Sequence, residues 1–261
     1  MQPPQFFLAN PLTGMLQHQG PFYDPLHDRV HLFFGVYPPP GEGPAKDQGG
    51  FRFWQHAVSN DTVFWRRLPD AIVPGDGNEC DATGAHSGST TLVGGDPVIL
   101  YTGSLAGPPG SPPGAQGAQV QCMARPKDRR DPDLAAWVRS GPLPLKPPQA
   151  GQHNFRDDTT GWRTKVDGKD EWRVAVGASV NISGETRGVA AVYRSQDFAT
   201  FDPEPVALVH GVDTSLPPIP AEGQPLRPTM WECPVSSIPW HSVCRVILST
   251  GFMCKHRISS E

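Results

Sequence analysis

The chain has 261 residues, which is long enough to bury a substantial core as one large domain or as two small ones. Its formal net charge is −4 and no Lys/Arg cluster has aromatic residues interleaved, which argues against a nucleic-acid surface. Proline (31) and glycine (28) are abundant, which fits either disorder or a fold of many short strands, and the 7 Trp and 12 Phe favour the folded alternative.

Four short segments of strand-forming residues follow one another along the chain, each ending in small residues. They are VHLFFGVY from Val30, VILYTGS from Val98, VAVGAS from Val174 and VILSTG from Val246, at steps of 68, 76 and 72 residues. A second landmark, an Asp shortly before an aromatic residue, recurs in phase at Asp61, Asp128 and Asp197, at steps of 67 and 69 residues. Two landmarks in phase predict one structural unit of about 70 residues that is repeated along the chain.

Short strand-like pieces lie between the landmarks, bounded by Gly, Pro, Asn and Asp turn signals and with little helical periodicity. A radially repeated unit of about four short strands is a β-propeller blade, so we predict an all-β fold of the propeller type. The Gly/Pro-rich insertions 37–50 and 106–119 are predicted to be flexible surface loops. The fourth segment lies close to Glu261, which predicts that the chain ends inside its fourth repeat.

Targeting, membrane and metal signals are weak throughout. No apolar run is long enough to span a bilayer, and the first 20 residues lack the basic start and apolar core of a signal sequence. The 5 cysteines are widely spaced, and the His, Cys and acidic residues show no metal-ligand spacing. We therefore expect no membrane segment, no signal sequence in this chain and no metal, and the sequence indicates neither the compartment nor the oligomeric state.

Polar stretches interrupt the strand pattern near the starts of the units. They are GAHSGSTTL (84–92), NFRDDTTGWR (154–163) and TMWECPVSS (229–237). Glu232 stands between a Trp and a Cys, and a carboxyl group among apolar residues is costly to ionise, which raises its pKa and suits proton transfer. Asp157 has Arg156 as its neighbour and is expected to stay charged. One protonated and one ionised carboxyl group are what glycoside hydrolysis requires.

Simpler interpretations apply to each of these residues. A Glu or Asp in a turn is most often solvated or caps the turn, and a Ser-rich stretch is most often turn chemistry. His56, in FWQHAVS, is expected to be a packed and hydrogen-bonded histidine. The acids nevertheless stand near the starts of successive propeller units, where they would converge on the central axis, and this favours a functional role for them.

The chain resembles the N-terminal propeller of glycoside hydrolase family 32, which comprises invertases, inulinases, levanases and fructan exohydrolases. FWQHAVSNDTVFWRRLPDAIVP is similar to the family's WGHA-S-D-x-x-x-W segment, HSGSTTL to SGSAT, NFRDDTTGWR to FRDP-T-x-W and MWECP to WECP. These correspondences are in the family's order, from about residue 5 to residue 248. The resemblance implies a five-bladed propeller, of which residues 1–261 form a truncated domain of about three and a half blades without the C-terminal β-sandwich.

The family's retaining reaction implies roles for individual residues. By motif match Glu232 is the acid/base and Asp157 stabilises the transition state, while Asp158 stands where the family has Pro. The resemblance further implies that Arg156, Trp54 and Ser87 contact the substrate, which would be sucrose or a fructan, and it implies no cofactor.

The stretch PLTGMLQHQG, from Pro11 to Gly20, departs from the family's P-x-x-G-W-M-N-D-P-N-G, whose Asp is the nucleophile. It is one residue shorter, and Gln17, His18 and Gln19 occupy the place of N-D-P-N. Gly35 also replaces a Gln that the family uses near the fructose. We therefore predict that the nucleophile is missing and that Gln17 and His18 lie at the sugar instead.

The resemblance implies a glycoside hydrolase of the β-fructofuranosidase type that cleaves terminal fructosyl bonds, and the missing Asp leaves the activity of this chain open. One alternative is a non-catalytic carbohydrate-binding relative in which Asp157, Glu232 and aromatics such as Trp54 hold a sugar. A fructosyltransferase would share the same acids, and a propeller used only as an interaction scaffold needs none of them. An unclosed propeller would expose strand edges, which predicts poor solubility or a need for a partner.

Overall fold

The computed structural model describes residues 16–37, 52–75, 79–111, 115–149, 154–182, 184–209, 230, 245–247 and 253–255. The chain divides into two compact units, Met1–Leu143 and Pro144–Glu261. Apart from the short 3-10 helix η2 (Glu79–Asp81), the elements of the described residues are all strands. Among the described residues, no helix has the length and hydropathy needed to cross a membrane.

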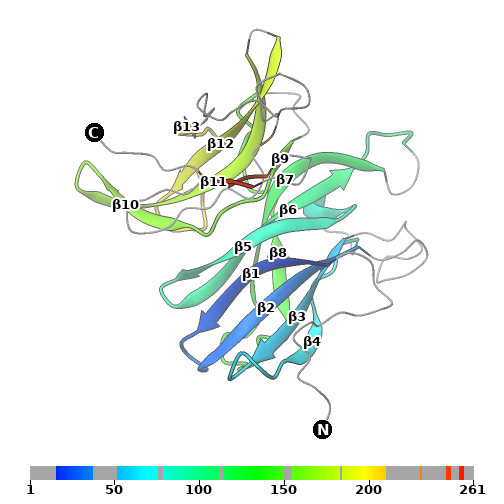
Figure 1. Ribbon diagram of the computed structural model, residues 1–261, viewed down its shortest axis with the longest axis vertical. Helices are drawn as coiled ribbons and strands as arrows, with labels where there is room; N and C mark the ends of the chain where they lie inside the picture. The colour runs from blue at the N-terminus through cyan, green and yellow to red at the C-terminus, as the bar shows by residue number, and fades with distance from the viewer. Residues whose placement is uncertain are drawn as a thin grey trace. The chain divides into compact units, whose positions relative to one another are not determined.

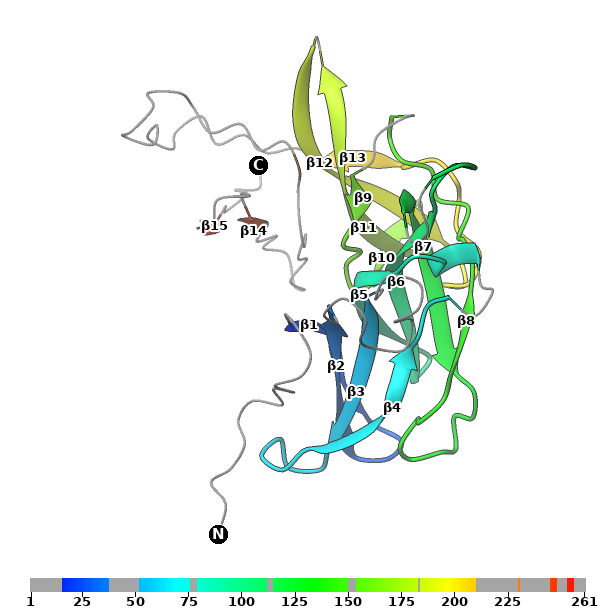
Figure 2. The ribbon, with the colours of Figure 1, turned by 90° about the vertical axis from the view of Figure 1, so that its right-hand side faces the viewer.

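The first unit holds two antiparallel four-stranded sheets in which chain neighbours are also sheet neighbours (Figures 1 and 2). The strands of the first sheet are β1 (Leu16–Asp24), β2 (Arg29–Val36), β3 (Phe53–Ser59) and β4 (Arg66–Ile72). Those of the second sheet are β5 (Ala85–Val93), β6 (Asp96–Ala106), β7 (Gln116–Pro126) and β8 (Trp137–Ser140). This up-and-down order of four strands is the order of a propeller blade.

The second unit repeats this plan with a broken first strand. Its sheet has the order β10-β11-β12-β13, and β9 pairs with β11 beside β10. The strands are β9 (Phe155–Arg156), β10 (Trp162–Val166), β11 (Lys169–Ile182), β12 (Glu185–Ser195) and β13 (Ala207–Val209). A separate pair joins β14 (Arg245–Ile247) to β15 (Met253–Lys255). The all-β propeller-type fold predicted from the sequence is confirmed.

The internal repeat is visible at the level of single hydrogen bonds. The predicted strand segments are β2, β6, β11 and β14, and Asp61, Asp128 and Asp197 each follow the third strand of a sheet. Asp61 Oδ1 accepts the N–H groups two and three residues ahead at 2.9 and 2.8 Å, and Asp197 Oδ1 does the same at 2.8 and 2.8 Å. The preceding Ser59 and Ser195 also accept equivalent pairs of N–H groups. One capped turn therefore recurs in the two units.

Glycine allows the positive φ that the tight turns between β5 and β6 and between β10 and β11 require. Gly94 and Gly95 connect β5 to β6 with φ of +63° and +94°, and Asp167 and Gly168 connect β10 to β11 with φ of +51° and +77°. Two consecutive residues with positive φ are typical of type I′ hairpins, whose twist matches that of the strands. These turns fix the register in which the first and second strands pair.

One predicted loop is shorter than expected. Residues 116–119 of the insertion 106–119 belong to β7, where Gln116 pairs with Ala106 and Gln119 with Ser104 of β6. The prediction failed there because extended pairing with a long neighbouring strand outweighs the low β-propensity of Gly and Gln. Most of the insertion 37–50 lies outside the described residues.

Large apolar side chains from both sheets form the core of the first unit. Phe33, Trp54 and Tyr101 are fully buried, with ring centroids 5.8 Å apart for Phe33 and Trp54 and 6.0 Å for Trp54 and Tyr101. In the second unit Phe155 packs edge-on against Tyr193 at 6.0 Å. Each such ring contributes about 2–3 kcal/mol of burial free energy. In the first unit the rings of Phe33, Trp54 and Tyr101 come from β2, β3 and β6, so their packing joins its two sheets.

Candidate functional site

The first strand of each of the three large sheets is interrupted at a polar stretch. The register shifts between Gln19 and Phe22 in β1 and between Ala85 and Gly88 in β5, and residues 157–161 separate β9 from β10. β-Bulges bend a strand, re-aim its side chains and are frequent beside active sites. The three stretches that carry the sequence motifs QHQG, AHSGS and FRDDTTGW are therefore the points where side chains are redirected.

In the first unit, the bulges of β1 and β5 are joined by hydrogen bonds. Gln19 is buried, and its Oε1 accepts the backbone N–H of Gly88 at 3.0 Å. The Oγ1 of Thr90 donates to the carbonyl of Gly20 at 2.7 Å. Gly20 has a φ of +37°, and a Cβ added there would lie 2.8 Å from the backbone N of Thr90. The glycine is thus required by both the backbone angle and the close approach of β5.

Gln19 also explains the glycine at position 35. A Cβ on Gly35 would lie only 2.6 Å from Nε2 of Gln19, so the Gln19 side chain passes over the face of β2 where residue 35 would project. A larger residue at position 35 would have to displace Gln19 and break its bond to Gly88. The two departures from the family pattern, at Gln19 and at Gly35, are therefore coupled.

Four predicted site residues lie in the first unit. Gln17 and His18 stand in β1 just before the bulge, opposite Gly35 and Phe34 of β2. Ser87 is half-buried within the bulge of β5. Trp54 is fully buried, and its Nε1 donates to the carbonyl of His86 at 2.8 Å. Because the Trp54 ring has no exposed surface in this structure, a sugar contact would require it to move, and its substrate role stays a prediction.

Two further predicted site residues lie in the second unit, where β9 ends. Asp157 is buried, with 6% of its surface exposed, and has a φ of +66°. Arg156 donates from Nη1 to Asn154 Oδ1 at 2.8 Å, and its Nε lies 4.0 Å from Asp157 Oδ2. A left-handed conformation costs a non-glycine residue about 1–2 kcal/mol, and Asp is one of the few residues that adopts it. The bulge thus sets Asp157 in a conformation that a regular strand excludes.

The bulge that holds Asp157 is closed by the residue two positions further on. The N–H of Thr159 donates to the carbonyl of Ala175 at 2.9 Å, and the N–H of Ala175 donates to Oγ1 of Thr159 at 3.0 Å. Asp158, which stands where the family has Pro, is buried with 6% of its surface exposed. Glu232 lies outside the described residues, and its predicted acid/base role stays a prediction. Among the described residues, no group of three His, Cys, Asp or Glu side chains could hold a metal ion.

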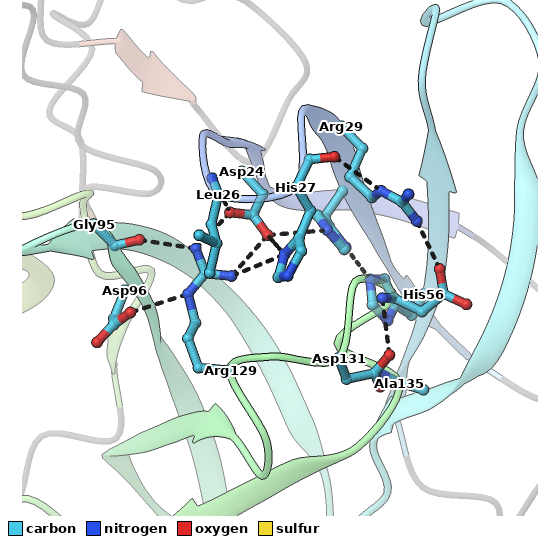
Figure 3. Close-up of polar contacts among 12 residues, drawn as sticks. Asp24, Leu26, His27, Arg29, His56, Gly95, Asp96, Arg129, Asp131 and Ala135 are labelled. Carbon is cyan, nitrogen blue, oxygen red and sulfur yellow. Dashed lines mark hydrogen bonds and ion pairs between the residues drawn. The ribbon is translucent and has the colours of Figure 1, made fainter.

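A buried polar cluster at the far end of β1 was not recognised from the sequence (Figure 3). Asp24 is fully buried and accepts from Arg129 at 2.5 and 2.8 Å, from the N–H of Leu26 at 3.0 Å, and pairs with Nδ1 of His27 at 2.7 Å. Burial opposes ionisation and is the largest single influence, but the hydrogen bonds from Arg129, His27 and Leu26 together hold the pKa of Asp24 well below its usual range. These contacts connect the β1–β2 turn to the segment before β8.

Two buried histidines continue the cluster into the core. Nδ1 of His31 lies 2.9 Å from Nε2 of His56, and Nε2 of His31 lies 4.0 Å from the carboxylate of Asp24. Both rings are fully buried, which confirms the sequence interpretation of His56 as packed and hydrogen-bonded. The cluster lies at the C-terminal end of β1, and its charged groups pair with one another, so we interpret it as structural.

The Gly88→Ala variant is expected to lower the free energy of unfolding by about 3 kcal/mol, because overpacking against rigid backbone forces the strands apart. A Cβ at Gly88 would lie 2.1 Å from the carbonyl oxygen of Leu100 and 2.6 Å from Cα of Tyr101. Urea unfolding followed by tryptophan fluorescence would measure the loss. Gly94→Asn is the control, since the space at Gly94 is open and Asn tolerates a positive φ; equal stability of the two variants would contradict the prediction.

Antiparallel four-stranded sheets that follow one another along the chain, with interrupted first strands, define a protein of the β-propeller class. The model of the glycosyl hydrolases family 32 N-terminal domain matches residues 2–239. The chain belongs to this family.

Curated relatives and solved structures agree with the assignment. The chain is 38% identical over 235 residues to β-fructofuranosidase 1 of Zea mays, covering 89% of this chain and 29% of that protein. It is 34% identical to the vacuolar acid β-fructofuranosidase 2 of a Rosa hybrid cultivar, covering 82% of this chain and 28% of the relative. The chain thus spans less than a third of the length of these relatives.

Among solved structures, a variant of fructan 1-exohydrolase IIa from Cichorium intybus, in complex with 1-kestose, matches with a TM-score of 0.64 at 29% identity, covering 87% of this chain and 36% of that one. A β-fructofuranosidase mutant of Bombyx mori in complex with sucrose matches with a TM-score of 0.57 at 24% identity, covering 85% of this chain and 39% of that one. The second likeness supports the fold alone.

Proposed function

We propose that this chain acts on the terminal fructosyl group of sucrose or a fructan, as a glycoside hydrolase domain of the β-fructofuranosidase type. The observation that carries the proposal is the family's acidic stretch in the bulge between β9 and β10, where Asp157 is buried beside Arg156. The names of the relatives, which are β-fructofuranosidases, support the substrate class.

In the proposed reaction each acid has a separate task. The ionised Asp157 accepts hydrogen bonds from fructose hydroxyl groups, and these bonds strengthen as positive charge develops on the ring. Glu232 donates a proton to the glycosidic oxygen as the bond to the anomeric carbon breaks, and afterwards takes a proton from the attacking water. Arg156 places a positive charge beside this carboxylate, with its Nε 4.0 Å from Asp157 Oδ2.

The retaining route also needs a carboxylate that bonds to the anomeric carbon in the first step. By motif match the place of that residue falls on Gln17 and His18 in β1, and neither supplies a carboxylate. A second candidate function therefore follows from this specific observation. The chain would bind the fructosyl group through Asp157 and Glu232 and not cleave it.

The two candidates are separated by one set of variants. Fructose release from sucrose and inulin would be measured for the parent, for Gln17→Asp and for His18→Asp. The same three proteins would be measured with Glu232→Gln added. Circular dichroism would first show that every sample is folded. The hydrolase proposal predicts release by the parent that falls roughly 10²–10⁴-fold when Glu232→Gln is added. The binding proposal predicts no release by the parent, and release only by an Asp variant that restores the missing carboxylate.

Binding is measured on the same samples by calorimetry with sucrose and inulin. Sucrose binding by the parent that is lost in Asp157→Asn, with no release, would establish the binding function. Release by the parent that vanishes in Glu232→Gln would establish the hydrolase and assign the nucleophile to another group. A folded parent that neither binds nor cleaves these sugars would contradict both proposed functions.

A further inference from the structure

An N-linked glycosylation motif lies on an exposed turn of the first unit. Residues 60–62 read Asn-Asp-Thr, which is the acceptor pattern Asn-X-Thr with X other than Pro. The three residues follow the last residue of β3 directly and are exposed. An acceptor asparagine has to lie on the surface, and Asn60 does.

The backbone of this turn is held by its neighbours and leaves the acceptor side chain free. Ser59 and Asp61 together accept the N–H groups of residues 61–64, as described above. Thr62 has a φ of +61° and donates from Oγ1 to the carbonyl of Asp61 at 2.6 Å. Within the described part of the chain, the carboxamide of Asn60 makes no hydrogen bond. It can therefore carry a substituent without breaking a hydrogen bond of the fold.

The surface around Asn60 offers room for a sugar. A cavity of about 310 Å³ is lined by Arg29, Val58, Ser59, Asn60, Asp61, Phe64 and Arg66. This volume is at the lower end of the range of small-molecule sites, which is about 300–1,000 Å³. Phe64 is 71% exposed, which is unusual for a large aromatic side chain. Because Asn60 and Phe64 line the same cavity, the first sugar of a glycan on Asn60 would begin close to this exposed ring.

A disulfide gives independent evidence that the chain passes through the secretory compartments. Cys80 in η2 and Cys122 in β7 are fully buried and joined by a disulfide, with their Cα atoms 6.1 Å apart. Disulfides persist in the oxidising secretory compartments and are rare in the cytosol. The same compartments attach glycans to Asn-X-Thr motifs.

We infer that Asn60 carries an N-linked glycan. In the transfer step the Nδ2 atom of Asn60 attacks the anomeric carbon of an oligosaccharide carried on a polyprenyl diphosphate. A bond forms between this nitrogen and the carbon, the bond from the carbon to the diphosphate oxygen breaks, and Nδ2 loses one proton. No electrons are transferred to another group, and the lipid diphosphate is the leaving group.

The test is a peptide measurement on the full chain, secreted by eukaryotic cells behind an added, cleavable signal peptide. Trypsin releases Asn60 in the peptide 53–66 and the second Asn-X-Ser motif, Asn181-Ile182-Ser183, in the separate peptide 174–187. Enzymatic removal of glycans in heavy-oxygen water converts only a glycosylated Asn into labelled Asp. We expect label at Asn60, loss of one glycan in Asn60→Gln and Thr62→Ala, and retention in Thr62→Ser, which keeps the hydroxyl.

Asn154→Gln is the matched control, because Asn154 is followed two positions later by Arg156 and forms no motif. An unlabelled Asn60 in secreted protein with an intact Cys80–Cys122 disulfide would overturn the inference. Free thiols at both cysteines together with an unlabelled Asn60 would overturn it as well. A glycan that persists on the peptide 53–66 in Thr62→Ala would show that its attachment does not use the motif, and would also count against the inference.

Discussion

Replacing Arg139 with Met is expected to lower the free energy of unfolding by about 3–5 kcal/mol, because the change leaves a buried carboxylate without its cationic partner. Asp81 is fully buried, and Nη1 of Arg139 lies 2.8 Å from each of its carboxylate oxygens. The hydroxyl of Tyr101 also donates to Asp81, at 2.8 Å, and a neutral donor does not compensate for the lost charge. Urea unfolding at neutral pH, followed by circular dichroism, would measure the difference.

Two controls separate charge from packing. The double variant Asp81→Asn/Arg139→Met removes both charges and should be more stable than Arg139→Met alone. Arg130→Met removes an arginine whose side chain is 90% exposed and pairs with Asp128 on the surface, so it should change stability little. If Arg139→Met lowered the free energy of unfolding no more than Arg130→Met does, the buried Asp81–Arg139 pair would not stabilise the fold.

The blade pattern was predictable because its signals are local in sequence. The strand segments that start at Val30, Val98 and Val174 are apolar and β-branched, and they became the second strands of three sheets. Asp61 and Asp197 mark the same capped turn because an Asx side chain needs only the next few N–H groups to form it. Information of this kind lies within a few residues and needs no knowledge of the tertiary structure.

Contacts between distant segments were not predictable. Arg129 stands in the run PKDRRDPD, which suggests a solvated charged loop, yet it binds Asp24 across 105 positions of the chain. The coupling of Gln19 to Gly35 is similarly hidden, since it depends on how β1 bends at its bulge. Residues 116–119 were missed for a related reason, because their strand exists only through pairing with β6.

The motif match selects candidate site residues, but it does not predict their geometry. The motif match selects Asp157, and the positive φ that positions it follows from the break between β9 and β10, which no propensity indicates. Trp54 illustrates the same limit. The resemblance implies a sugar contact for Trp54, which stays a prediction, and it does not indicate that the ring is fully buried in the core.

Acidification from about pH 6.5 towards pH 4 is expected to destabilise the first unit, because the His31–His56 pair is buried in the neutral form. Burial lowers the pKa of His31 to about 4; the charges of Asp24 and Asp133 oppose this decrease, and those of Arg29 and Arg129 add to it. Burial, and then the neighbouring His31, lower the pKa of His56 to about 3.

The sign of the effect follows from proton binding. Between the folded and unfolded pKa values of His31 the unfolded chain binds more protons, so stability is present at neutral pH and is lost as the pH falls. A decrease from 6.5 to about 4 corresponds to roughly 3 kcal/mol for His31 alone, and protonation of Asp24 acts in the same direction at still lower pH.

The measurement is the free energy of urea unfolding at a series of pH values from 7 to 4.5, for the parent and for His56→Gln. Because Gln does not titrate, the variant should show a shallower decrease with falling pH than the parent, whatever its stability at neutral pH. His27→Gln is the comparison, since His27 is partly exposed at the edge of the same cluster and its replacement leaves the buried pair intact. A stability of the parent that does not change between pH 6.5 and 4.5 would mean that the two rings accept protons without cost, and would contradict their assignment as a neutral buried pair.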